Sequence, residues 1–237
     1  MLNQLKEDLR RFASPQKARL LQRFFKTGPG DYGEGDKFLG LKVPESRLVA
    51  KKYKDLPLNQ IKTLLHSPIH EERLVALLIL IEQFKKAKEA EKEKIYRFYL
   101  DNTKYINNWD LVDLSAHKIV GPYLEDKPKD ILKKLARSKS LWERRIAILS
   151  TFHYISLGDP TLSIEIAEML LDEKHDLIHK AVGWMLREIG KNCGEQILTN
   201  FLDKHISAMP RTMLRYSIEK FPEEKRQKYL NKVFQQP

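Results

Sequence analysis

The chain has 237 residues, of which 42% are hydrophobic, so it can bury a core and a wholly disordered chain is excluded. Its 43 Lys and Arg outnumber its 32 Asp and Glu, for a formal net charge of +11. A surplus of this size indicates a polyanionic partner, either nucleic acid or an acidic membrane surface. The single cysteine, Cys193, excludes a disulfide framework and a thiolate zinc site, and is typical of a reducing, cytoplasmic protein.

The first 25 residues mix charged and apolar side chains at helical spacing. They contain no uninterrupted apolar stretch, so we expect no signal peptide. The longest apolar run, residues 74–81, is too short to cross a bilayer. We therefore expect a soluble protein that does not insert into a membrane.

Residues 28–40, GPGDYGEGDKFLG, hold five of the ten glycines and interrupt the helical pattern. The segment matches G-x-G-x-x-G, but a charged helix precedes it and more glycine follows, which argues against a dinucleotide site. It forms either a long turn or a small hairpin. As a projecting hairpin it would touch DNA through Lys37, with Tyr32 or Phe38 as the packing or stacking residue. Alternatively, Phe38 and Leu39 pack against the first helices while the glycines make the turn.

Prolines divide the rest of the chain into short segments. Nine of the eleven (positions 15, 44, 57, 68, 122, 128, 160, 210 and 222) stand where an amphipathic segment begins, as is typical of a first helical turn. Segments such as 141–157 and 175–189 carry apolar residues at i, i+3, i+4 and i+7. Short helices joined by tight turns predict an all-α fold, a HEAT-like helical-repeat solenoid forming a single domain over residues 1–237. An irregular helical bundle is the alternative.

The histidine pairs do not predict a metal site. His66 and His70 are separated by Pro68, and His175 and His179 have no third or fourth ligand in the nearby sequence. We interpret all four as structural or surface residues. No metal or other cofactor is therefore predicted.

Asn107 and Asn108 begin a helix in which Trp109 and Asp113, four residues apart, share one face. A carboxylate on the same stripe as a tryptophan is uncommon, because burying it without a partner costs several kcal/mol. A functional carboxylate is one interpretation of this placement. The other, which spacing alone favours, is that Asp110 caps the helix and Asp113 forms a salt bridge to a neighbouring helix.

Basic residues gather in the second half of the chain. Residues 127–145 carry eight basic and two acidic residues and end in Arg144 and Arg145, which could bind phosphates or form a solvated basic face. Trp184 lies one turn from Lys180 and from Arg187, with Gly183 allowing close backbone approach, although packing in the core is the alternative for the tryptophan. The C-terminal helices add Arg211 and Arg215.

These motifs, in this order, resemble the AlkD-like family of HEAT-repeat DNA glycosylases, the DNA alkylation repair proteins. The resemblance covers most of the chain. It is carried by WDLVD (109–113), LWERRIAILS (141–150), KAVGWMLREIGK (180–191) and MPRTMLRYSIEKF (209–221).

The resemblance implies a monomeric base excision repair enzyme that holds double-stranded DNA on a concave surface. It would hydrolyse the N-glycosidic bond of cationic N3- and N7-alkylpurines without flipping the base. The family's catalytic residues match Asp113, Trp109, Trp184 and Arg145, and a further aromatic corresponds to Phe24 or Phe25. We expect Arg144, Lys180, Arg187, Lys37, Arg211 and Arg215 to bind DNA. The insert at 28–40 departs from the family pattern.

Two other functions compete with the enzyme. A non-catalytic DNA-binding relative could prefer branched or distorted DNA, which the Gly-rich insert favours. A protein–protein scaffold is disfavoured by the charge of +11 and by the aromatic and carboxylate residues at 109–113.

Overall fold

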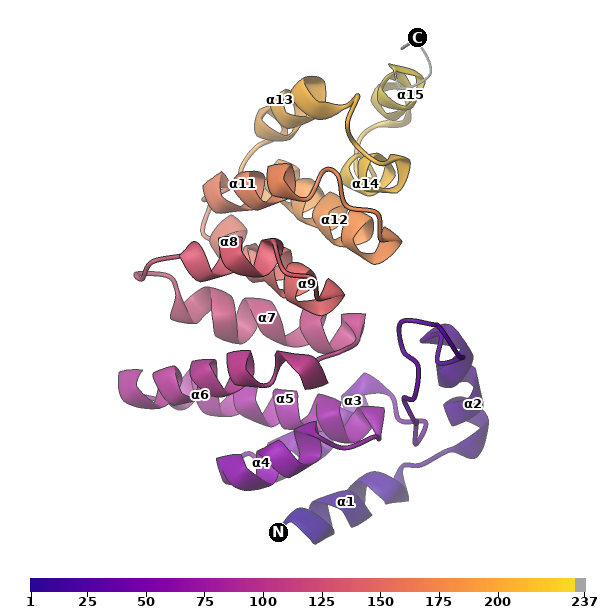
Figure 1. The fold of residues 1–237 in the computed structure, drawn as a ribbon, viewed down its shortest axis with the longest axis vertical. Helices are drawn as coiled ribbons and strands as arrows, with labels where there is room; N and C mark the ends of the chain where they lie inside the picture. Colours follow the sequence, from indigo (N-terminus) through magenta and orange to yellow (C-terminus); the bar gives the residue numbers. More distant parts are fainter. Residues whose placement is uncertain (233–237) are drawn as a thin grey trace. The chain divides into compact units, whose positions relative to one another are not determined.

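The structure is a computed structural model that describes residues 1–232 (Figure 1). The residues described form helices and no strand, apart from an isolated parallel bridge between Lys37 and Ile69. The predicted all-α class is therefore confirmed, and the fold is consistent with the predicted helical-repeat solenoid. The chain divides into two compact units, Met1–Ser115 and Ala116–Pro237.

The first unit is built around one central helix. Its elements are α1 (Leu2–Arg11), α2 (Pro15–Phe24), α3 (Val43–Lys52), α4 (Leu58–Leu65), α5 (His70–Lys86), α6 (Glu89–Asp101), the short 3-10 helix η1 (Thr103–Tyr105) and the first turns of α7 (Trp109–Tyr123). The apolar run 74–81 forms the middle of α5 and is buried throughout. This run can be apolar on all sides because α3, α4 and α6 all pack against α5 (Figure 1).

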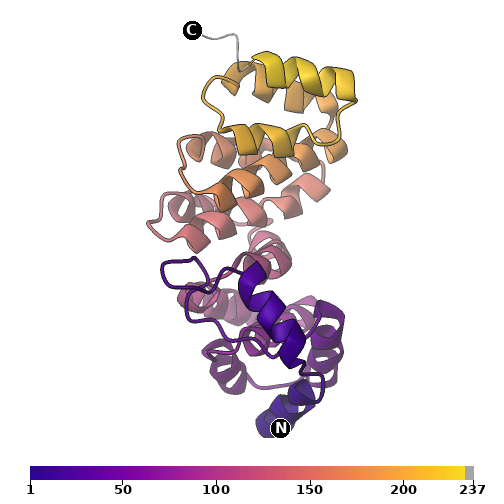
Figure 2. The ribbon, with the colours of Figure 1, turned by 90° about the vertical axis from the view of Figure 1, so that its right-hand side faces the viewer.

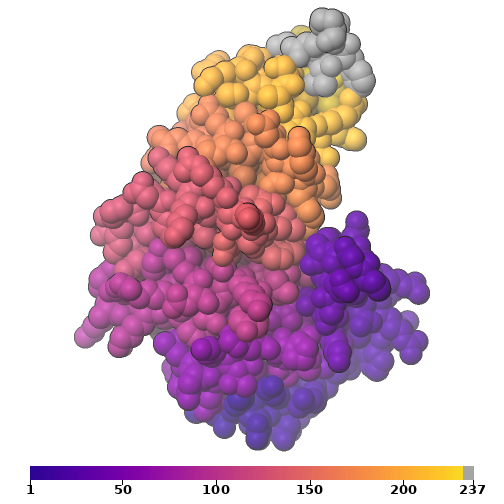
Figure 3. Space-filling view, in the orientation of Figure 1, coloured from indigo at the N-terminus to yellow at the C-terminus, as the bar shows by residue number. Residues whose placement is uncertain are grey.

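Helix α2 differs from its neighbours because none of its residues is fully buried. It begins in the predicted way, with Pro15 in the first turn and the hydroxyl of Ser14 accepting a hydrogen bond from the amide of Lys17 at 3.4 Å. Figures 2 and 3 show α2 and the Gly-rich segment after it at one side of the first unit.

The second unit stacks short helices in pairs. They are α8 (Asp130–Ala136), α9 (Leu141–Ser150), α10 (Phe152–Ser156), α11 (Thr161–Met169), α12 (Asp176–Asn192), α13 (Glu195–His205), α14 (Arg211–Ser217) and α15 (Glu223–Lys232). Helix α8 packs on α9, and α12 packs on both α13 and α14. Gly183 is needed for the last contact, because a Cβ there would lie 2.5 Å from the carbonyl oxygen of Met213.

Eight of the nine prolines expected at helix starts lie within two residues of one, and Pro122 does not. Pro122 lies inside α7, one residue before the helix ends at Tyr123. The prediction for this proline is therefore wrong. The residue marks the end of a helix, where the chain is already leaving the helical path.

Candidate functional site

An apolar groove of about 610 Å³ lies in the first unit, between α2 on one side and the first turns of α3, α5 and α7 on the other. Trp109 and Asp113 both line it, as their four-residue spacing on α7 predicts. The Asp113 side chain is half-buried. An ionisable oxygen at an apolar and aromatic wall is a suitable partner for a cation, because the surroundings screen the charge less than water does.

Aromatic rings form a continuous column beside the groove. Trp109 stacks on Phe25 with 5.0 Å between ring centroids and 17° between planes. Phe25 stacks on Phe38 at 5.1 Å, and Phe38 stacks on the imidazole of His70 at 4.6 Å. Phe24 stands outside the column, edge-on to Trp109 at 5.8 Å and 64% exposed. The two phenylalanines that the sequence could not separate both line the groove, but Phe25 is buried and Phe24 is exposed.

Behind the groove lies a buried charge cluster of four side chains, Asp36, His70, Arg73 and Asp110. The His70 Nδ1 is 3.1 Å from Asp36 Oδ2, and its Nε2 is 2.8 Å from Asp110 Oδ2. Arg73 donates to the same Asp36 oxygen at 2.6 Å and to the carbonyl of Ser67 at 3.0 Å. Two carboxylates and two basic side chains therefore satisfy one another away from water.

The electrostatics of the cluster favour a charged imidazole. Burial by itself would lower the pKa of His70, but the carboxylates of Asp110 and Asp36 raise it to about 9. Burial also opposes ionisation of Asp36, yet its hydrogen bond to His70 and the charge of Arg73 hold its pKa below the usual value. A protonated imidazole can donate from both ring nitrogens to the two carboxylates that face it.

The Gly-rich segment is held firmly at its C-terminal end. The Glu71 carboxylate accepts hydrogen bonds from the amides of Leu39, Gly40 and Leu41 at 3.0, 2.8 and 3.2 Å. The backbone of Lys37 bonds to that of Pro68 and His70.

Gly40 has a φ of +91°, which other residues rarely adopt. Of the two alternatives for this segment, packing against the helices is the one observed for Phe38. Its ring is buried, so Phe38 is a packing residue, whereas the Lys37 side chain is exposed.

In the second unit, the two adjacent arginines of α9 are already engaged. Arg145 is only 4% exposed and donates to the carbonyl of Leu177. Arg144 donates to Glu173 at 2.5 Å and to the carbonyl of Ser138 at 2.8 Å. The interpretation of this pair as a merely solvated basic face is therefore wrong, because both guanidinium groups hold neighbouring elements.

Trp184 and its neighbours on α12 are also tied to acidic side chains. The half-buried indole donates to Glu188 at 3.1 Å and lies 6.0 Å from the ring of Phe152. Arg187 pairs with Glu219 and Glu188, and Lys180 pairs with Asp176 at 2.6 Å. Arg211 and Arg215 of α14 are both exposed.

The structure agrees with the predicted structural role of His66 and His70. His66 bonds to Asn102 at 2.7 Å and stacks on Tyr105, and His70 belongs to the charge cluster. Within residues 1–232, no group of three or more His, Cys, Asp or Glu side chains could hold a metal ion. Over the same residues, no helix combines the length and the apolar character needed to cross a membrane.

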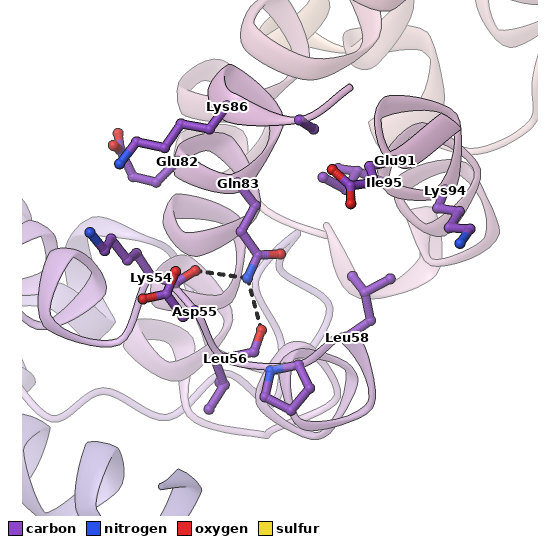
Figure 4. A pocket seen from close by; sticks show the side chains of 12 residues that line it. Lys54, Asp55, Leu56, Leu58, Glu82, Gln83, Lys86, Glu91, Lys94 and Ile95 are labelled. Carbon is purple, nitrogen blue, oxygen red and sulfur yellow. Dashed lines mark hydrogen bonds between the residues drawn. The ribbon is translucent and has the colours of Figure 1, made fainter. Parts of the chain in front are cut away.

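A second depression, of about 490 Å³, lies between α5, α6 and the loop that precedes α4 (Figure 4). Gln83 closes it from one side by donating to the carbonyls of Lys54 and Leu56, both at 2.8 Å. Lys94 lies across the depression from Lys54 and Lys86 (Figure 4). With acidic residues interspersed, this surface has no dominant sign of charge and indicates no ligand.

Comparison with known proteins decides the family. The family model described as DNA alkylation repair enzyme matches residues 5–221. The chain belongs to this family. Among solved structures, a chain described as a predicted DNA alkylation repair enzyme from Enterococcus faecalis superposes with a TM-score of 0.68 at 17% identity, over 89% of this chain and 97% of that one. At this identity the likeness shows the fold alone. No curated protein matches the sequence.

For this DNA alkylation repair family member, sequence reasoning missed the charge cluster. His70 was interpreted as structural, but its partners Asp36 and Asp110 are 34 and 40 residues away in the chain. No spacing rule connects such positions. Nothing in the local sequence separates Asp36 from Asp31 and Glu34, the other acidic residues of the Gly-rich segment.

Proposed function

We propose that this family member is a DNA glycosylase that removes cationic N3- and N7-alkylpurines from duplex DNA without flipping the base. The observation that carries the proposal is that Asp113 and Trp109 both line one apolar groove. Membership of the DNA alkylation repair family implies that the binding partner is DNA. The net charge of +11 is consistent with that partner.

The proposed reaction is hydrolysis of the bond between C1′ of the deoxyribose and the purine nitrogen. When this bond breaks, its electron pair goes to the base, which leaves as a neutral molecule because it carried a positive charge. Water adds to C1′ and gives up a proton, leaving an abasic site. A cationic base needs no general acid, so the main demand on the protein is to stabilise positive charge developing on the sugar.

The Asp113 carboxylate meets that demand by electrostatic attraction, and it can also orient the attacking water. Trp109 adds cation–π attraction to the charged base, worth about 0.5–2 kcal/mol. The family resemblance implies a catalytic role for Trp184 as well. Phe24, exposed and edge-on to Trp109, is the aromatic that we assign to the DNA side of the groove. Phe25 supports Trp109 from the core.

Phosphate binding is assigned to the basic residues of both units. Lys37, Arg211 and Arg215 have exposed side chains, which makes them accessible to DNA. Arg144, Lys180 and Arg187 have acidic partners and would exchange these for phosphates. Arg145 is buried and donates to the carbonyl of Leu177 in the first turn of α12. We therefore assign it the role of positioning this end of α12 for DNA binding.

The test is release of 7-methylguanine and 3-methyladenine from methylated duplex DNA by the wild-type protein. We expect both bases to be released and an abasic site to remain. A parallel gel-shift experiment compares linear DNA with a four-way junction. No release of either base, together with tighter binding to the junction, would overturn the proposal and support a non-catalytic branched-DNA binder instead.

A further inference from the structure

We propose that His70 is a positioning residue for Trp109, acting through Asp110 and Asp36, and that the Gly-rich segment supplies Asp36 for this purpose. The inference rests on the proposed glycosylase function, which it deepens by naming what holds the aromatic side of the site. It gives the Gly-rich segment a structural task within the site.

Both residues that flank Trp109 are held by the buried charge cluster. On one side, Asn108 donates to Asp36 Oδ2 at 3.3 Å, and its own Oδ1 accepts the amide of Trp109 at 2.8 Å. On the other side, Asp110 accepts from His70 at 2.8 Å and from the amide of Leu111 at 2.9 Å. The start of α7 is thus fixed at three successive residues, which sets the direction in which Trp109 leaves the helix.

The aromatic column provides a second, independent link between His70 and Trp109. The imidazole stacks on Phe38 with planes 21° apart, Phe38 on Phe25 at 20°, and Phe25 on Trp109 at 17°. Nearly parallel rings in van der Waals contact transmit a displacement, because a packed interior has no free volume to absorb it. A shift of the imidazole therefore changes the support beneath Trp109.

Charge explains why a histidine occupies this position. The ring must donate at both nitrogens, since each faces a carboxylate oxygen, and only the imidazolium form has two N–H groups. With Arg73, the protonated ring balances the two carboxylates. The raised pKa of His70, about 9, is consistent with that state at neutral pH.

Two amide variants separate the two hydrogen bonds. In His70→Gln the side-chain nitrogen takes the place of Nε2 and keeps the bond to Asp110, whereas in His70→Asn it takes the place of Nδ1 and keeps the bond to Asp36. Asp110 adjoins Trp109 directly, so we expect His70→Gln to keep at least a third of the wild-type single-turnover rate of 7-methylguanine release. We expect His70→Asn to lose tenfold or more.

Melting temperature and duplex affinity are measured on the same variants. Positioning predicts similar melting temperatures for the two variants and duplex affinities within threefold of the wild type, because the exposed cations are unchanged. If the two rates are equal, or if each rate falls only in proportion to the loss of melting temperature, His70 is merely structural and the proposal is overturned. If His70→Asn fails to fold, Asp110→Ala removes the acceptor of the same hydrogen bond and must show the tenfold loss.

A fluorescence measurement keeps this test separate from the proposed function. In a Trp142→Phe and Trp184→Phe background, Trp109 is the only tryptophan. His70→Asn should shift its emission maximum, and His70→Gln should leave it near that of the parent. If the wild-type protein releases no base but this shift is present, the proposed function fails and the positioning role stands. Unchanged emission in both variants contradicts the positioning role itself.

A matched pair of variants tests the role of the Gly-rich segment. Asp36 and Asp31 are carboxylates of the same segment, but Asp36 is buried in the charge cluster and Asp31 is exposed. We expect Asp36→Asn to lower the rate of base release fivefold or more, and Asp31→Asn to change it less than twofold. Equal effects of the two substitutions would assign the segment a surface role and contradict the inference.

Discussion

Trp109 and Asp113 of the first unit line an apolar groove. In the second unit, Arg145 donates to the carbonyl of Leu177 and Trp184 donates to Glu188. In the first unit the charges behind the groove pair with one another, in Asp36, His70, Arg73 and Asp110. Asp113 lies outside this charge cluster, at the wall of the groove.

In the second unit the basic groups hold local structure instead. Arg145 bonds to the carbonyl of Leu177, and Arg144 and Arg187 pair with acidic side chains. The comparison is consistent with the proposed chemistry on a cation in the first unit. In the second unit, the pairs of Arg144 and Arg187 would have to open before either side chain could bind a phosphate, as the proposal requires.

The largest effect on stability should come from the aromatic column of the first unit. Phe25→Ala removes a buried ring between Trp109 and Phe38, and we expect it to lower the free energy of unfolding by about 3–5 kcal/mol. Phe24→Ala, one residue away and 64% exposed, should cost less than about 0.5 kcal/mol while lowering the rate of base release. Urea denaturation and base release on both variants check this. Equal stabilities would refute the assignment of the two rings.

The charge cluster should make stability fall at alkaline pH. Because Asp110 and Asp36 raise the folded pKa of His70 from 6.5 to about 9, with Arg73 opposing, its contribution is complete below pH 6.5 and is lost as the pH rises through 9. The stability advantage of the wild type over His70→Gln should shrink by about 2–3 kcal/mol between pH 6 and pH 9.5. Urea titrations at several pH values measure it. Parallel pH profiles for the two proteins would show that His70 is not charged in the fold.

In the second unit, Arg145→Ala should destabilise by about 2 kcal/mol, since the carbonyl of Leu177 loses the guanidinium that donates to it. Arg145→Lys should restore only part of this, because an ammonium lacks the planar fork. The salt dependence of DNA binding, measured alongside, tests the phosphate contact that the family resemblance implies. A slope reduced by about one, with no change in stability, would mean that Arg145 binds DNA and does not hold α12.

A smaller effect is expected at Arg215, which is exposed on α14. Arg215→Ala should weaken duplex binding and reduce the slope of log K against log salt by about one, since one phosphate contact is lost. Lys204 is a suitable control because it pairs with Glu168 at 2.9 Å, and Lys204→Ala should leave the slope unchanged. Equal changes in both variants would indicate a general effect of net charge and not a contact by Arg215.

The features of the structure that depend on neighbouring residues could be predicted from the sequence. Helical spacing predicted the all-α class, proline positions marked most helix starts, and the spacing of Trp109 and Asp113 placed both on one face of a helix. Pro122 was misplaced because a proline near a helix end has the same flanking pattern as one near a start.

The rest of the site depends on contacts between distant segments. Whether Phe24 or Phe25 supports Trp109 is decided by how α2 meets α7, and two adjacent phenylalanines have the same local signal. Glu71 looks like an ordinary first-turn acid, yet it binds three amides of the Gly-rich segment. The local sequence of Arg145 is typical of a surface cation, and its burial depends on the packing of α12.

The most direct test of the central claim is the single-turnover rate of 7-methylguanine release by Asp113→Asn, measured beside its affinity for duplex DNA. A transition-state interaction lowers the rate without a matching loss of ground-state binding when it is removed. We predict a rate at least about a hundredfold below that of the wild type, about 3 kcal/mol of lost transition-state stabilisation, with the dissociation constant within about twofold. Release at the wild-type rate, or a loss of binding that matches the loss of rate, would contradict the catalytic role of Asp113.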